Sequence, residues 1–403
     1  MLRHRVADMI KAIKNNEAVS NGLFFQLGLT CYVIQALSKI TYFGTDVVNL
    51  SFFSAPALLF CLLQEVTVNK RTRDTYVVLA SFALLTVIQH ALGGRNLLAL
   101  FALVFTARGL PIKRVLWTTF ALLGISLVVT VFLAKLGIIT NVCASRGAGT
   151  PLRYGLGFIG WTYSSYFVFV MASIYALLKR DKARLSVLAL LFAGDLWIYC
   201  QTDTRNGFFL TLFVLAALCV SKFLSHRGIE LNFPQNRAVI VMVSSVFILA
   251  FLVSTALVLL YQFGGGWIEA VDRFMSFRLR YGSEALHDYG LSLFGVAVNW
   301  DQVDYVVDIS YLRVTLEYGL VAALAIVALL TYTTWCFVSR GEVLPSLICV
   351  FFAVFYSFDP VMVTAFLNPL IFVGTHFASS RLSCRKTEAS DLRDELCENP
   401  SRD

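Results

Sequence analysis

One group of polar segments in this chain carries arginine as its only basic residue. These segments alternate along the sequence with others in which Lys and Arg are mixed. The arginines are Arg95, Arg146, Arg153, Arg205, Arg273, Arg278, Arg280 and Arg313. A planar guanidinium stays charged when it is partly desolvated, and it makes paired hydrogen bonds to phosphate or carboxylate. The set predicts an anion-binding site, and the alternative is that each arginine pairs with a nearby Asp or Glu.

Arg278 is the strongest single candidate. Residues 267–281 have helical periodicity, with Trp267, Val271 and Phe274 on one face. Such a helix is expected to rest on a membrane surface or on the rim of the protein. Arg278 falls in the centre of the apolar face, where an unpaired charge is costly. We therefore expect Arg278 to point into a pocket that supplies an anion.

The segment after this helix mixes carboxylates, aromatic rings such as Trp300, and His287. Rings stack on sugar C–H faces and carboxylates bind hydroxyls, so the mixture suits a carbohydrate, with an ordinary solvated loop as the alternative. His287 is a proton acceptor or a plain surface histidine. Asp308 precedes an apolar block, where it either caps a helix or acts as general base on an acceptor hydroxyl. Arg280 is a further binding candidate, and Gly282 is expected to end the helix just after it.

Two shorter segments complete the candidate set. The Gly-rich stretch 141–158 holds Arg146 and Arg153. The turn that contains Arg205 also contains Asp203, which could serve as its local partner. Asp195 lies inside an apolar block, and an intramembrane carboxylate favours a functional role by default.

The composition explains what must position these residues. The chain has 403 residues, of which 58% are hydrophobic and 14% charged, with a mean hydropathy of +0.73. Soluble domains are roughly 45–50% apolar and about 25% charged. The formal charge of +8 lies in small clusters between apolar blocks, which indicates membrane topology rather than nucleic-acid binding. The nine cysteines have no metal-ligand spacing. The sequence predicts an all-α, multi-pass membrane protein.

About twelve apolar blocks are long enough to be considered as membrane helices. The predicted spans are 22–43, 48–68, 75–92, 95–108, 115–140, 157–178, 184–201, 207–224, 237–261, 310–338, 343–358 and 360–378. Most of the 33 Lys and Arg residues fall in segments that would face the cytoplasm if the N-terminus is inside. This orientation makes 1–21 and 379–403 cytoplasmic, the second as a disordered tail, and it makes 262–309 a long outward loop. The arginine-only segments all face outward.

With these residues in place, the chain resembles the Wzy-type polysaccharide polymerases of bacterial capsule, exopolysaccharide and O-antigen assembly. Short motifs in a fixed order carry the resemblance over roughly residues 90–375. They are Arg153-Tyr-Gly-Leu-Gly-Phe158, Thr204-Arg205, Arg278-Leu279 before Leu293-Phe-Gly295, Asp308-Ile-Ser-Tyr311 leading to Gly319, and the ten-residue spacing between Arg146 and Gly157. The outward His-Asn pair of some relatives is missing after the Leu-Gly-Phe stretch.

The resemblance implies a GT-C-like membrane glycosyltransferase that needs no metal or other cofactor. Its substrates would be oligosaccharide repeats on undecaprenyl diphosphate, joined at the outer face of the bacterial cytoplasmic membrane, with a chain-length regulator as a further partner. For this function we expect Arg278, Arg205, Asp308 and His287 to be catalytic. The expected binding residues are Arg153, Arg146, Arg280, Tyr311, Trp300 and Gly295. An O-antigen-ligase-like transferase is the main alternative, and a polysaccharide transporter or flippase is another, although the internal repeats that a transporter predicts are not seen.

Overall fold

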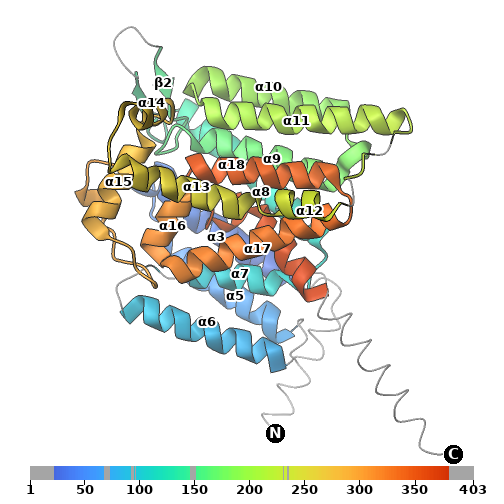
Figure 1. Ribbon diagram of the computed structural model, residues 1–403, viewed down its shortest axis with the longest axis horizontal. Coiled ribbons are helices and arrows are strands. Elements are labelled where there is room, and N and C mark those ends of the chain that lie inside the picture. The colour runs from blue at the N-terminus through green and yellow to red at the C-terminus, as the bar shows by residue number, and fades with distance from the viewer. Residues whose placement is uncertain are drawn as a thin grey trace, which may run out of the picture.

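The computed structural model describes residues 22–67, 73–91, 95, 97–145, 151–229, 231–233 and 236–380. The predicted N-terminal segment 1–21 and residues 381–403 of the predicted tail lie outside this part of the chain. The described residues are mainly α-helical (Figure 1). One short antiparallel hairpin, β1 (Cys143–Ala144) and β2 (Arg153–Tyr154), pairs Cys143 with Tyr154.

The helices follow the predicted apolar blocks in chain order. They are α3 (Leu23–Ile40), α4 (Phe43–Asp46), η1 (Ser51–Phe53), α5 (Ser54–Thr67), α6 (Arg73–Ala91), α7 (Leu98–Ala107), α8 (Ile112–Lys135), α9 (Tyr163–Lys179), η2 (Arg180–Lys182), α10 (Leu185–Thr202), α11 (Arg205–His226), α12 (Arg237–Ser244), α13 (Val246–Tyr261), α14 (Gly266–Phe274), α15 (Arg278–Tyr289), η3 (Trp300–Gln302), α16 (Ser310–Tyr318), α17 (Leu320–Ser339), α18 (Val343–Phe358) and η4 (Ala365–Leu367). Residues 369–380 are also helical.

Five described helices are long and apolar enough to cross a membrane, namely α3, α8, α10, α11 and α17. A sixth span results if α12 and α13, which meet at a bend of 48°, are counted as one. The other apolar helices are shorter than a full crossing by the same measure, so the expected number of twelve spans is not confirmed.

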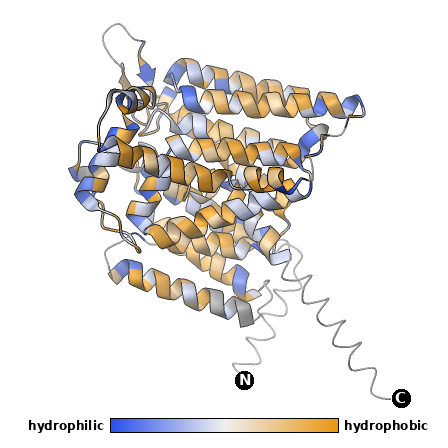
Figure 2. Ribbon diagram, in the orientation of Figure 1, coloured by the Kyte–Doolittle hydropathy of each residue, from blue (hydrophilic) through white to orange (hydrophobic). Residues whose placement is uncertain are grey.

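The outer surfaces of these helices suit lipid rather than water. Val128 on α8 is 67% exposed and Leu190 on α10 is 71% exposed. Apolar residues continue around the helices, and the polar residues gather toward the helix ends (Figure 2). A helix that is apolar on all sides needs an apolar environment on all sides. The fold therefore suggests a membrane protein.

Helix α18 lies at the centre of the bundle and contacts α9, α11, α13 and α17. Its Phe352 and Phe355 are fully buried, and both rings contact the ring of Phe169 on α9, with centroids 4.9 Å and 4.8 Å apart. Such aromatic pairs contribute about 0.5–1.5 kcal/mol each beyond their buried area. This contact fixes the position at which α18 ends, directly before Asp359.

Two predicted helices are broken in the structure. The segment 267–281 forms α14 and α15, separated by a turn in which Ser276 and Phe277 have positive φ angles of 58° and 66°. The prediction of one continuous helix there was wrong. Gly282 does not end that helix, since it lies inside α15, where Leu312 and Val258 leave no room for a side chain.

The block 310–338 divides into α16 and α17 at Gly319, where φ is +91°. An extended segment covers this break, since the amide N–H groups of Leu320 and Val321 donate to the carbonyls of Ser292 and Leu293, and the N–H of Val296 donates to the carbonyl of Leu316. Backbone groups away from water need such partners. The segment 292–296 and the broken helix therefore form one unit.

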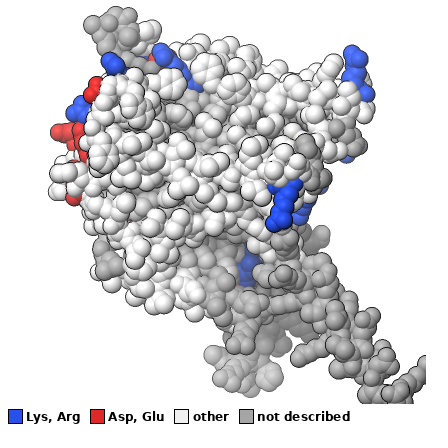
Figure 3. Space-filling model, in the orientation of Figure 1, with Lys and Arg blue, Asp and Glu red and all other residues white. Residues whose placement is uncertain are grey.

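The bundle has two different ends, here called the α15 end and the opposite end. The α15 end carries α14, α15 and the β-hairpin, whereas the opposite end carries η2 and the connection from α11 to α12 (Figure 1). In the view of Figure 3, the visible Asp and Glu side chains gather at the α15 end together with some basic ones, and the opposite end shows Lys and Arg. Every outward segment of the predicted topology that the structure describes at length lies at the α15 end.

Candidate functional site

Arg278 is the first residue of α15, and the chain reaches it through the strained turn at Ser276 and Phe277. Asp272 holds this start of the helix, because its carboxylate accepts hydrogen bonds from the backbone N–H groups of Leu279 at 2.8 Å and Arg280 at 3.1 Å. A carboxylate on the free N–H groups of a first helical turn stabilises the helix by about 0.5–2 kcal/mol. The Arg278 side chain is thereby directed into the protein.

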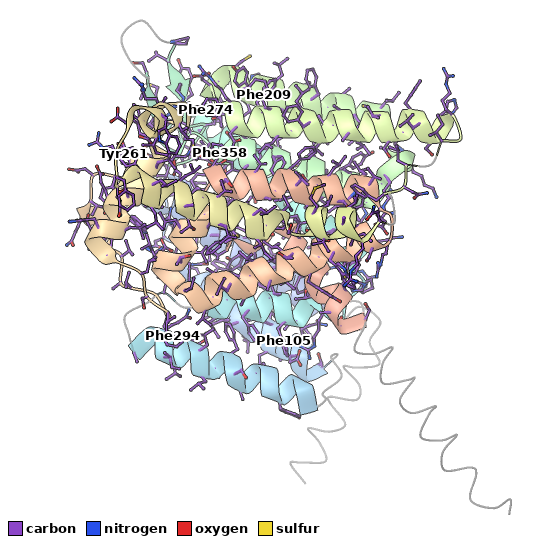
Figure 4. All side chains as sticks on the ribbon, viewed as in Figure 1. Phe105, Phe209, Tyr261, Phe274, Phe294 and Phe358 are labelled. Atoms are coloured by element: carbon purple, nitrogen blue, oxygen red, sulfur yellow. The ribbon has the colours of Figure 1, made fainter. Side chains whose placement is uncertain are left out.

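The Arg278 guanidinium lies between two carboxylates. Its Nε is 3.4 Å from Oδ2 of Asp308, and its Nη2 is 3.7 Å from Oδ1 of Asp359. The side chain is only 15% exposed. Its Cζ also lies 5.7 Å from the centre of the Phe358 ring, which is found at the α15 end in Figure 4. The anions beside Arg278 are the protein's own carboxylates, which corresponds to the alternative that the arginine pairs with Asp or Glu residues.

Asp359 is the most buried charged group of this centre, with 1% of its side chain exposed. The Tyr166 hydroxyl donates to its Oδ1 at 2.5 Å, and the Asn206 amide donates to its Oδ2. The hydroxyl of Ser310 donates to its backbone carbonyl. Burial raises the pKa of Asp359 to about 6, and Arg278 and the Tyr166 hydrogen bond oppose that rise. The protonation state of Asp359 can therefore be changed by a moderate change of pH around 6.

Asp308 is the more accessible carboxylate, with 37% of its side chain exposed. The residue before α16 that occupies the capping position is Ile309, and no side chain caps that helix, so Asp308 does not act as an N-cap. Desolvation raises the pKa of Asp308, and the positive charges of Arg278 and Arg313 oppose that rise. Asp308 is thus a partly exposed carboxylate whose orientation depends on Arg278.

A second ionic cluster centres on Glu317 of α16, which is 3% exposed. Arg313, four residues earlier on the same helix, contacts its Oε1 at 2.9 Å, and Arg95 contacts its Oε2 at 3.3 Å. The indole N–H of Trp300 donates to Oε1 at 2.5 Å, and the Arg313 guanidinium lies over the Trp300 ring at 5.0 Å. Trp300, a predicted sugar-binding residue, is therefore engaged in holding this cluster together.

Arg205 begins α11 and is 67% exposed, and its Nε lies 3.8 Å from Asp203, the local partner that the sequence suggested. The Arg153 side chain donates to the carbonyl of Thr202 at 2.6 Å and lies 5.2 Å from the ring of Trp161. Because Asn206 of α11 contacts Asp359, the start of α11 connects these arginines to the Arg278 centre.

The other predicted residues lie apart from that centre or have structural roles. Arg280 pairs with Glu284 at 2.9 Å on the exposed side of α15, and His287 is 88% exposed beside Asp288. Tyr311 is fully buried, and its hydroxyl donates to the carbonyl of Ala353. Gly295 has a φ of +95°, and a Cβ there would lie 2.5 Å from the carbonyl oxygen of Glu317. Arg146 lies outside the described residues.

Sequence reasoning missed three residues of the centre, namely Asp359, Asn206 and Tyr166. Asp359 falls at the junction of two predicted spans that were read as continuous apolar blocks. Its signal was an Asp-Pro pair between two such blocks, since the residue before proline is disfavoured in helices and marks a helix end. Asn206 adjoins a predicted residue, Arg205, and only the fold shows that it faces Asp359.

Comparison of the chain with protein-family models, with curated proteins and with solved structures finds no match.

Proposed function

We propose that this chain is a polysaccharide polymerase that joins oligosaccharide repeats carried on a lipid diphosphate, with undecaprenyl diphosphate as the carrier. The proposed site is at the α15 end, on the outer face of a bacterial cytoplasmic membrane, with both termini in the cytoplasm. The proposed architecture is GT-C-like. The observation that carries this proposal is the buried Arg278, held between Asp308 and Asp359, with the exposed Arg205 at the same end of the bundle next to Asn206, which contacts Asp359.

Each part of the arrangement fits one requirement of glycosyl transfer from a lipid diphosphate. The leaving diphosphate needs cationic groups near the membrane surface, and Arg205 offers an exposed guanidinium at the N-terminus of a helix, where anions are favoured. The acceptor hydroxyl needs a base, and Asp308 is the more exposed carboxylate of the centre. The lipid tail needs an apolar surface, which the outer faces of α10 and α11 provide.

In this scheme Arg278 is a positioning residue. Two carboxylates already match the charge of Arg278, so its role is to hold Asp308 in place and not to bind the diphosphate. Arg153 shares the diphosphate with Arg205, and Asn206 and Tyr166 keep Asp359 aligned with Arg278. His287 is exposed and has no contact with the centre, so we assign it no catalytic step.

The first experiment is to delete the gene in its host and to measure the size of the surface glycan and of the lipid-linked glycan. A polymerase predicts loss of long polymer and accumulation of single repeats on the carrier. Complementation with Asp308→Asn should fail to restore polymer, whereas Asp304→Asn should restore it, because Asp304 is an exposed carboxylate of the same segment with no contact to the centre.

Other outcomes contradict the proposal in distinct ways. Long polymer that accumulates on the carrier without reaching its final acceptor would indicate a ligase. Repeats trapped on the cytoplasmic face would indicate a flippase. An unchanged glycan profile would remove glycan assembly as the function.

A further inference from the structure

A cavity of about 540 Å³ lies at the α15 end and is lined by residues from the second half of α15. Its lining residues come from the end of α13, from α15 and from the segment after η3. They are Gln262, Ser283, Glu284, His287, Asp288 and Tyr305. Cavities of roughly 300–1,000 Å³ are typical of small-molecule sites in proteins. None of these residues is part of the bond-forming centre described above.

The wall of this cavity is ordered by contacts within the protein. The Tyr305 hydroxyl donates to Oδ2 of Asp288 at 2.7 Å, and the Tyr305 ring stacks on that of Tyr281, with centroids 6.4 Å apart and planes at 12°. The Tyr305 hydrogen bond, followed by that of His287, lowers the pKa of Asp288, so this carboxyl is ionised at neutral pH. The result is a fixed aromatic ring beside a fixed carboxylate.

Ser283 supplies an independent sign of a ligand. Ser283 is 9% exposed and lines the cavity, and within the described part of the chain its hydroxyl has no protein hydrogen-bond partner and is open to water from the cavity. A ligand group that takes the place of that water gains a net hydrogen bond of about 0.5–1.5 kcal/mol. The hydroxyl therefore points to an occupant that carries its own donors or acceptors.

The charge of the lining selects the class of occupant. Glu284 and Asp288 are both carboxylates, but Arg280, which is outside the lining, pairs with Glu284 at 2.9 Å and matches its charge. The negative charge of Asp288 disfavours phosphate, and the remaining lone pairs of both carboxylates favour neutral groups that donate hydrogen bonds. The ring of Tyr305 offers an apolar face, and the combination of a ring with carboxylates and a hydroxyl matches the C–H and O–H groups of a sugar.

We propose that this cavity binds an uncharged, hydroxyl-rich segment of the glycan chain, at a distance from the bond that forms. This inference rests on the proposed function, because it assigns the cavity to the same glycan. Arg278 and Asp288 are ten residues apart on α15, which corresponds to about 15 Å along the helix axis. The diphosphate would lie on the arginine side of α15 and the distal sugars on the carboxylate side.

The test is direct binding of a soluble oligosaccharide of several repeat units, released from the host's own glycan, to the purified full-length protein in lipid nanodiscs. We expect saturable binding, weakened roughly tenfold by Tyr305→Ala through loss of ring stacking. Ser283→Ala, which removes only the hydroxyl, should weaken binding roughly fivefold. Asp304→Asn, an exposed carboxylate in the same segment and outside the cavity, should bind as the wild type does.

The outcomes separate this inference from the proposed function. Wild-type affinity in both cavity variants, or absence of binding by the wild-type protein at millimolar oligosaccharide, would overturn the inference even if gene deletion abolishes polymer. Cavity-dependent binding in a protein whose deletion leaves polymer intact would support a glycan site and overturn the polymerase. In cells, Tyr305→Ala should shorten the polymer while the first linkage still forms.

Discussion

The substitution Arg278→Lys tests whether a planar fork, rather than a positive charge alone, is needed at the centre. The guanidinium contacts Asp308 through Nε and Asp359 through Nη2, at 3.4 Å and 3.7 Å, from a side chain that is 15% exposed. A lysine ammonium is a single point of charge and can face one of these carboxylates well, but not both. One charge-assisted contact is therefore lost.

Both contacts are ion pairs longer than a good hydrogen bond, and the Arg278 Nε has no hydrogen-bond partner among the described residues, so we take about 1.5 kcal/mol, the lower end for charge-assisted contacts. Since about 1.4 kcal/mol changes a rate tenfold, kcat for chain extension should fall at least roughly tenfold in Arg278→Lys. The KM for the lipid-linked repeat should change little, because the diphosphate is assigned to Arg205 and Arg153. The assay is the initial rate of extension of purified lipid-linked repeats by protein in proteoliposomes, at equal protein content.

The matched control is Arg227→Lys, an identical exchange at the opposite end of the bundle, where the exposed Arg227 lies over the Phe223 ring at 5.2 Å. It should retain the wild-type rate. A kcat for Arg278→Lys within twofold of wild type, in protein with an unchanged unfolding temperature, would refute the positioning role of Arg278. A raised KM with unchanged kcat would instead assign Arg278 to donor binding.

Three further predictions concern the centre and its support. The pKa of Asp359 is about 6, and its ionised form holds Arg278, so the extension rate should fall as the pH drops below about 6. Asp359→Asn should lower the rate at neutral pH and should remove this acid limb of the pH–rate profile. Tyr166→Phe removes a hydrogen bond that lowers this pKa, so the midpoint of the acid limb should move to higher pH; an unmoved midpoint would contradict the assignment to Asp359. Gly295→Ala should destabilise the protein by about 1–3 kcal/mol, because the φ of Gly295 is +95° and a Cβ there would meet a backbone carbonyl. The control is Gly194→Ala, in open space on α10, which should be neutral or stabilising. Thermal unfolding measures both.

The apolar periodicity predicted the helices well, because the length of an apolar block and its polar flanks are local properties. The segments around Arg205, Arg278 and Asp308 were correctly predicted to come to one end of the bundle, since alternating topology places alternate loops together. For Arg313, the alternative that an arginine pairs with a nearby carboxylate holds, since Glu317 is four residues further along the helix and that contact depends only on helical geometry.

Contacts between distant segments were beyond prediction from the sequence. Arg278 meets Asp359 only because α18 ends where its aromatic contact with α9 places it. The break at Gly319 was missed because the residues on both sides continue the apolar pattern, and the hydrogen bonds that satisfy the break come from Ser292 and Leu293. A periodicity argument contains no information about such partners.

The unit formed by the segment 292–296 and the broken helix has a consequence for how product length could be set. This segment follows directly from the end of α15, and its hydrogen bonds attach it to α16. Under the proposed function, the Arg278 centre and the cavity would lie at a fixed separation of about 15 Å along the axis of α15. A glycan repeat shorter than that separation would reach only one of the two sites until a further unit had been added. Processive extension would then begin only after the first few linkages. The number of linkages needed would depend on the separation of the two sites along α15 and not on which sugars the repeat contains.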